Sequence, residues 1–216
     1  MAIAFVGKTA TQSSAGSAIS FAADPSGADI MWLGISIRDT RSISVAPAFN
    51  GVTMTQSGST SGTTGITNYL YYLANPFQGS ANVTFTQSSS DNYTAKAAWF
   101  SGASSASVPD ATSVGGPTTT SSYSQSVTSV ADNCFAVLWA DATSGSTLTG
   151  GSNTTVADQP ELVFTGGFMA YSTAAKTPAG TFTLNVTSSS QAFAGCMASF
   201  APSTFTRKAL TLLGVS

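Results

Sequence analysis

The chain has no histidine and few charged side chains, with seven basic and nine acidic residues among 216. Proton transfer, nucleophile activation and metal binding depend mainly on His, Cys, Asp, Glu and Lys. Because these residues are few and scattered here, the sequence argues against an enzyme and offers no ligand set for a metal or a cofactor. The net charge of −2 comes without a basic stripe. We therefore expect no nucleic-acid partner, since clustered Lys and Arg provide phosphate affinity.

Long apolar runs are missing as well. No stretch approaches the roughly 18 consecutive apolar residues that a transmembrane helix needs, so we expect no membrane insertion. The first eight residues lack a basic region before a short apolar run and do not resemble a signal peptide. A charge-poor, Ser/Thr-rich chain without an export signal is typical of a virion component. Such a protein folds in the host cytoplasm and is exposed after lysis.

The only two cysteines, Cys134 and Cys196, lie within apolar, strand-like runs. Sequence spacing alone does not establish a disulfide, because the bond requires specific geometry. We expect two free, buried thiols that pack like small hydrophobic residues, with a disulfide as the alternative.

The hydrophobic fraction of 42%, with thirteen Phe, six Tyr and three Trp, is sufficient for a folded core. Polar and apolar residues alternate with the period of two that a half-buried strand requires, and other runs are wholly apolar, as in central strands. We expect Trp32, Trp99 and Trp139 to be core residues. The Asn50-Gly51 step is the strongest hairpin signal in the chain. Alternation is found in residues 81–86, 122–130 and 181–187, and apolar runs in residues 30–37 and 134–140.

The chain also contains an internal repeat. Three segments of the first half are echoed in the same order in the second half: residues 29–35 by 132–138, 76–88 by 178–189, and 95–100 by 195–200.

This repeat, together with short strands at regular spacing, predicts an all-β fold, an antiparallel β-sandwich with jelly-roll-like character. We expect residues 1–202 to form one sandwich from two related halves, about 1–104 and 105–202. The polar segment 103–121 is the one plausible boundary between halves, or a long loop that crosses between sheets. Two separate sandwiches are the alternative, and each would need a complete core.

Two of the nine acidic residues have a structural interpretation. Asp29 and Asp132 each precede a strand, where an Asp side chain commonly caps a turn through nearby backbone. Asp158 and Glu161 are close enough in sequence to suggest the two carboxylates of a glycosidase. Pro160 lies between them and Glu161 opens a predicted strand, which argues against a catalytic pair.

Aromatic residues suggest a second possibility, because rings stack on carbohydrate faces. Tyr69, Tyr71 and Tyr72 are close in sequence, and Phe77 occupies a predicted hairpin tip. These four residues are candidates for a carbohydrate-binding face, and ordinary sheet packing is the alternative.

Residues 203–216 follow the second repeat and are therefore surplus to the sandwich. They can cover an edge of their own sheet or dock on a neighbouring subunit. Residues 3–6 can likewise close an edge. The candidate docking residues of the tail are Phe205, Arg207, Lys208, Leu210, Leu212 and Leu213.

Several turn and strand motifs resemble a group of jelly-roll or lectin-like β-sandwich proteins from tailed-phage structural modules and bacterial surfaces. The resemblance covers residues 27 to about 200 and lacks a catalytic signature. It implies a non-enzymatic virion structural protein, a head-decoration or tail/fibre component that contacts other virion proteins and copies of itself. The alternative is a carbohydrate-binding adhesion or receptor-binding module that recognises host-surface glycans. The motifs are Gly27-Ala-Asp29, Phe49-Asn-Gly51-Val-Thr-Met54-Thr, Tyr-Tyr-Leu-Ala-Asn75-Pro76, Gly79-Ser-Ala-Asn-Val-Thr and Ala-Trp-Phe-Ser-Gly102.

Overall fold

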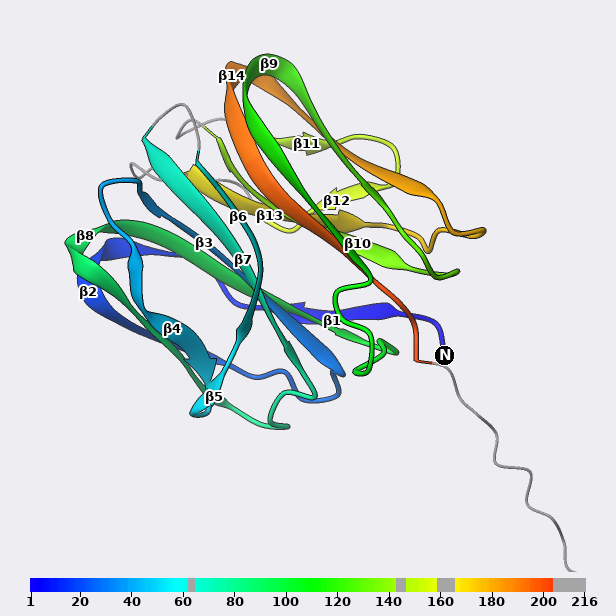
Figure 1. Ribbon diagram of the computed structural model, residues 1–216, viewed down its shortest axis with the longest axis horizontal. Coiled ribbons are helices and arrows are strands. Elements are labelled where there is room, and N and C mark those ends of the chain that lie inside the picture. The colour runs from blue at the N-terminus through cyan, green and yellow to red at the C-terminus, as the bar shows by residue number, and fades with distance from the viewer. Residues whose placement is uncertain (62–64, 143–146, 159–165, 204–216) are drawn as a thin grey trace, which may run out of the picture.

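The computed structural model describes residues 1–61, 65–142, 147–158 and 166–203. Within these ranges the chain forms strands and no helix, and the strands make two curled antiparallel sheets (Figure 1). The predicted all-β antiparallel sandwich is confirmed. The strands are β1 (Ala4–Lys8), β2 (Gln12–Ala23), β3 (Ile30–Arg38), β4 (Ile43–Phe49), β5 (Val52–Thr53), β6 (Thr55–Ser61), β7 (Ile66–Ala74), β8 (Ala81–Ser101), β9 (Ala111–Thr128), β10 (Phe135–Ala142), β11 (Thr149–Gly150), β12 (Thr154–Val156), β13 (Gly166–Ser172) and β14 (Thr181–Phe200).

Each sheet is built from one half of the chain, and the two sheets share one strand order. The first sheet has the order β5-β4-β8-β3-β7-β6, with β1 and β2 also paired to β8. The second has the order β11-β14-β10-β13-β12, with β9 also paired to β14. The corresponding pairs of strands are thus β4 and β11, β8 and β14, β3 and β10, β7 and β13, and β6 and β12. The sequence repeat corresponds to a repeated arrangement of strands.

Strand register corrects one of the three sequence echoes. Ile30 pairs with Phe100 in the first sheet, and Phe135 pairs with Phe200 in the second. Ile30 and Phe135 are therefore equivalent positions of the repeat. The match of residues 29–35 with residues 132–138 instead aligns Ile30 with Asn133, an error of two residues. The comparison was wrong here because an all-apolar run has no alternation to define its register, which only the cross-strand partners establish.

The connection between the halves is shorter than expected. Strand β8 ends at Ser101 and β9 begins at Ala111, so only residues 102–110 connect the two sheets. Most of the predicted boundary, residues 103–121, instead belongs to β9. Pro117 is compatible with this strand because the described residues pair β9 only with β14, which leaves one edge without ladder hydrogen bonds.

The core consists of three clusters. The first sheet curls around one that includes Leu33 and Phe85, and the second around one that includes Leu138 and Phe193. The third, which we call the interface cluster, lies between the sheets. Trp32, Trp99 and Trp139 are all buried, as predicted. The interface cluster comprises Ile3, Ile30, Trp32, Leu70, Ala98, Phe100, Ala103, Phe135, Val137, Trp139, Ala157, Met169, Cys196, Ala198 and Phe200.

Trp139 sets the spacing of the two sheets. A Cβ atom on Gly34 of β3 would lie 2.0 Å from the Trp139 ring, and one on Gly167 of β13 would lie 2.3 Å from it. Atoms at such distances overlap, so both positions require glycine for the indole to fit. The Trp139 indole Nε1 also donates a hydrogen bond to Ser36 Oγ at 3.0 Å.

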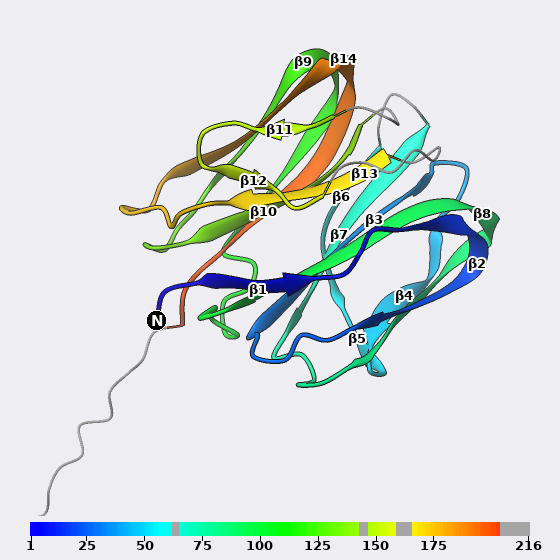
Figure 2. The ribbon, with the colours of Figure 1, turned by 180° about the vertical axis from the view of Figure 1, so that it is seen from behind.

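Strand β1 connects the two sheets at their boundary (Figure 2). It pairs with β8, which confirms that residues near 3–6 close an edge of the first sheet. Phe5 also stacks on Tyr171 of β13, with ring centroids 4.8 Å apart. The predicted hairpin is confirmed as well, because Asn50 and Gly51 have positive φ angles of 48° and 77° between β4 and β5.

We predict that Gly34→Ala lowers the free energy of unfolding by about 2 kcal/mol, because the added methyl group overpacks the buried Trp139 ring. Gly116→Ala is the matched control, since a Cβ there meets no atom within 4 Å. Urea unfolding followed by tryptophan fluorescence measures both. Equal stability of the two variants would contradict this account of the interface.

Candidate functional site

The interface between the sheets has a polar end. Ser36 Oγ donates to Asn68 Oδ1 at 2.5 Å, and Asn68 Nδ2 donates to Asp141 Oδ1 at 2.7 Å. All three side chains are buried, and they come from β3, β7 and β10. Because a buried polar group without a partner is costly, this network favours one alignment of the two sheets.

A cluster of ion pairs also joins the two halves. The Lys96 side chain from β8 is fully buried, and its ammonium group contacts the carboxylate of Asp158. Lys8 Nζ lies 3.7 Å from the same carboxylate and donates to the backbone oxygen of Ala157. Thr11 Oγ1 lies 3.4 Å from Asp158 Oδ2. Two cations of the first half therefore contact one anion of the second.

The pKa of Asp158 reflects these contacts. Partial burial acts to raise the pKa, but the hydrogen bond from Lys96 and the positive charges of Lys96 and Lys8 outweigh it. The carboxyl pKa is consequently lowered, and Asp158 stays ionised near neutral pH. The second member of the carboxylate pair considered from the sequence, Glu161, lies outside the described residues.

Other carboxylates hold turns and strand ends together. Asp29 accepts the backbone N–H of Gly102, and Asp132 accepts that of Ala179 at 2.6 Å. Both were predicted as turn residues that cap nearby backbone. Their partners instead lie 73 and 47 residues away along the chain, because the starts of β3 and β10 meet residues that follow or precede other strands.

The structure does not bring the four predicted carbohydrate-binding residues into one face. Successive residues of a strand point to opposite faces, so Tyr71 packs in the first-sheet cluster whereas Tyr72 contacts Trp32 at the interface. Tyr71 is buried, and its hydroxyl donates to Gln56 Oε1 at 3.2 Å. Tyr69 is half-buried. Phe77 is 50% exposed and lies in the loop before β8.

Cys134 and Cys196 are free and buried, as expected. Burial, with the Asp110 charge as the next cause, raises the pKa of Cys134 to about 12. Burial, with the Asp141 charge, raises the pKa of Cys196 to about 12. Neither thiol is a nucleophile at neutral pH, because the thiolate is the reactive form.

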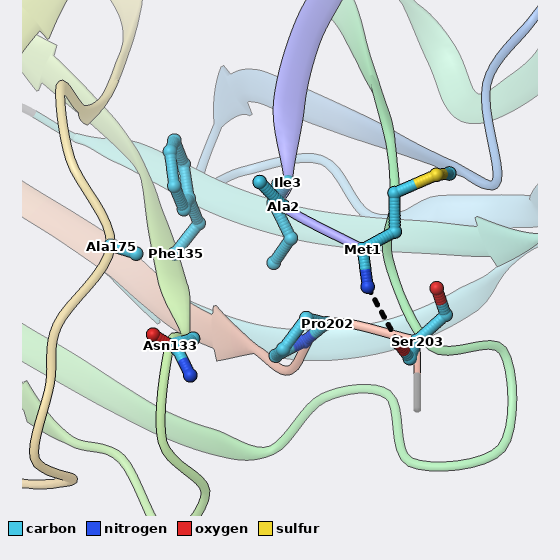
Figure 3. A pocket seen from close by; sticks show the side chains of 8 residues that line it. All are labelled: Met1, Ala2, Ile3, Asn133, Phe135, Ala175, Pro202 and Ser203. Carbon is cyan, nitrogen blue, oxygen red and sulfur yellow. Dashed lines mark hydrogen bonds between the residues drawn. The ribbon is translucent and has the colours of Figure 1, made fainter. Parts of the chain in front are cut away.

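At its other end the interface is apolar and opens in a hollow of about 790 Å³ (Figure 3). The Met1 amino group donates to the Ser203 carbonyl at 3.1 Å, and the Ser203 N–H donates to the Gly102 carbonyl at 2.7 Å. Both ends of the described chain are thus held at the rim of the hollow. Its lining includes Ile3, Asn133, Phe135, Ala175 and Pro202.

A second hollow of about 570 Å³ adjoins the first and shares Asn133 and Pro202 with it. Its lining includes the carboxylates Asp110 and Asp132. The hollows at this end make it our candidate site for a partner. The tail residues predicted to dock, from Phe205 to Leu213, lie outside the described residues.

No family model, curated protein or solved structure matches the chain. Among the described residues, no three His, Cys, Asp or Glu side chains are grouped closely enough to hold a metal ion. No helix with the length and apolar character needed to span a membrane occurs in the same part of the chain.

Sequence reasoning missed the residues that define both ends of the interface. Lys96 and Asp141 carried a usable signal, because each interrupts a run of apolar strand residues. Met1, Asn133 and Ala175 carried none, since only the fold brings them to one hollow.

We predict that Asp158→Asn lowers the free energy of unfolding at pH 7 by about 1 kcal/mol. The expected loss is small because 40% of the Asp158 side chain is exposed and solvent screens the ion pair. The pKa of Asp158 is lower in the folded protein than in the unfolded chain, where it is near 3.9. The ion pair therefore stabilises the protein fully above the unfolded pKa, and this stabilisation is lost as the pH falls through the folded pKa. The difference from the unsubstituted protein should therefore shrink as the pH falls through the lowered pKa of the folded state. Asp24→Asn, an exposed turn residue, is the control for urea titrations at each pH. A difference that persists unchanged in acid would contradict the ionic mechanism.

We also predict that neither cysteine reacts with iodoacetamide at pH 8 in the folded protein. With pKa values of about 12, roughly one thiol in 10,000 is ionised at that pH. Mass spectrometry should detect alkylation only after denaturation. Rapid labelling of the native protein would show that the thiols are accessible.

Proposed function

We propose that this protein is a non-enzymatic virion structural protein of a tailed bacteriophage, a head-decoration or tail/fibre component that acts through contacts between subunits. The observation that carries the proposal is the convergence of Met1, Ser203 and two adjoining hollows at one end of the sandwich. A chain that continues beyond Ser203 from such a place is suited to connect one subunit to another. The resemblance of its turn and strand motifs to phage structural proteins supports the same role.

The use of charge within the fold also supports this role. Asp91 pairs with Arg38 and Arg41, Asp158 pairs with two lysines, and Asp110 accepts the backbone N–H groups of Val130 and Ala131. These contacts stabilise the protein's own strands and loops. A large part of the remaining surface consists of exposed Ser and Thr, as in the hydroxyl pairs between β9 and β14. Such a sandwich serves as a rigid unit for adhesion and assembly.

A carbohydrate-binding module has less support. Tyr71 and Tyr72 lie on opposite sides of β7, so the predicted tyrosine face does not form a single stacking platform. A glycan array with Tyr69→Ala as the control variant tests this alternative, because Tyr69 is the more exposed of the two rings on its side of the strand. Binding that Tyr69→Ala abolishes would favour the module.

We predict that the full chain forms a defined oligomer in solution and that removal of residues 204–216 reduces it to a monomer. The truncation leaves Ser203, with its hydrogen bonds to Met1 and Gly102, in place. Light scattering after size-exclusion chromatography gives the mass, and the unfolding midpoint of both forms serves as the folding control. Monomers of equal stability in both cases would overturn the proposal.

A further inference from the structure

We propose that the adjoining hollows at the chain ends receive residues 204–216 of a second copy of this chain, and that two copies exchange these segments reciprocally. This inference rests on the proposed function, because it names the subunit contact through which the protein would act. The larger hollow has an apolar floor that includes Ile3, Phe135 and Pro202. Figure 3 shows these side chains around an open space with Asn133 at its edge.

The hollows match the sequence of the segment in polarity. Phe205, Leu210, Leu212 and Leu213 are its large apolar residues, and the larger hollow presents apolar side chains. Asn133 adds a donor, since its Oδ1 accepts the Thr177 hydroxyl at 2.5 Å while its Nδ2 makes no hydrogen bond with the described residues. An extended segment offers backbone carbonyl groups to such a donor.

The hollows also match the segment in charge. Asp110 and Asp132 line the smaller hollow, and neither forms an ion pair within the described part of the chain. The segment has two charged side chains, Arg207 and Lys208, and both are positive. In an extended chain Arg207 and Lys208 lie about 7 to 10 Å beyond Phe205. With Phe205 in the larger hollow, the two cations would reach the smaller hollow, because the hollows share Asn133 and Pro202.

A second copy suits the geometry better than the chain's own segment. The N–H and C=O groups of Ser203 are both held by hydrogen bonds, to Gly102 and Met1, so the direction of the chain is fixed where it passes the rim. Residues 204–213 include no Gly, Pro, Asn or Asp, the residues that favour a tight reversal. Two copies related by a twofold axis at this end would each present a segment to the other's hollow.

Disulfide trapping between two differently sized chains tests the exchange directly. One chain has Ala175→Cys, at an exposed position on the rim, and the other, extended by a tag, has Phe205→Cys. Mild oxidation of the mixture should give a linked heterodimer on a non-reducing gel. Ala46→Cys, exposed on β4, replaces Ala175→Cys in the control mixture and should not be linked. The two native cysteines are buried and should not interfere.

Substitutions at the hollow provide a second test. Ala175→Trp fills the larger hollow and should raise the dissociation constant of the oligomer by about tenfold or more, whereas Ala46→Trp should leave it unchanged. Asp132→Asn keeps the oxygen that accepts the Ala179 N–H but removes the charge. It should weaken association and reduce its dependence on salt.

The outcomes separate this inference from the proposed function. Trapping only within one chain that has both Ala175→Cys and Phe205→Cys would show that the segment occupies its own hollow and would overturn the exchange. A stable oligomer that is neither trapped nor weakened by Ala175→Trp would overturn the inference and leave the proposed function standing. A monomeric full chain would overturn both.

Discussion

The close packing of the two sheets depends on the Trp139 indole, which lies against Gly34 of the first sheet and Gly167 of its own sheet. Gly34 and Gly167 leave the space that the ring fills, and Ser36 satisfies its N–H group. A ring held in this way fixes both the distance and the alignment of the sheets, because close-packed interiors tolerate neither overlap nor empty space. The same alignment brings Ser36, Asn68 and Asp141 into one buried network. It also brings Lys96 into contact with Asp158.

This contact also shows how two related halves make one asymmetric molecule. By strand register, Gly34 of the first half is the equivalent of Trp139 of the second, and Lys96 is the equivalent of Cys196. At the same position of the repeat, one half has the largest side chain and the other has none. The two halves are therefore complementary in side-chain size where they meet. Each sheet has its own core cluster, and the interface cluster joins the two into a sandwich.

The interface between the sheets differs in polarity from one end to the other. One end is polar, and its charged groups are engaged with one another across the two halves. The other end opens in two adjoining hollows, of which the larger has apolar lining residues and the smaller includes Asp110 and Asp132, and it holds both Met1 and Ser203. Ionic and hydrogen-bonded contacts thus fix the fold at one end, while at the other end apolar side chains line an opening to the surface.

The amino-acid sequence by itself determined the all-β class, the repeat, the buried tryptophans and the Asn50-Gly51 hairpin, because period-two alternation, apolar runs and turn residues act locally. It also indicated free, buried thiols. Only the tertiary structure decided the register of β3 against β10, the opposite directions of Tyr71 and Tyr72 relative to the core, and the grouping of Met1, Asn133 and Ala175 around one hollow. These features depend on contacts between residues far apart in the chain. Cross-strand pairing and sheet packing specify them, and neither leaves a pattern in neighbouring residues.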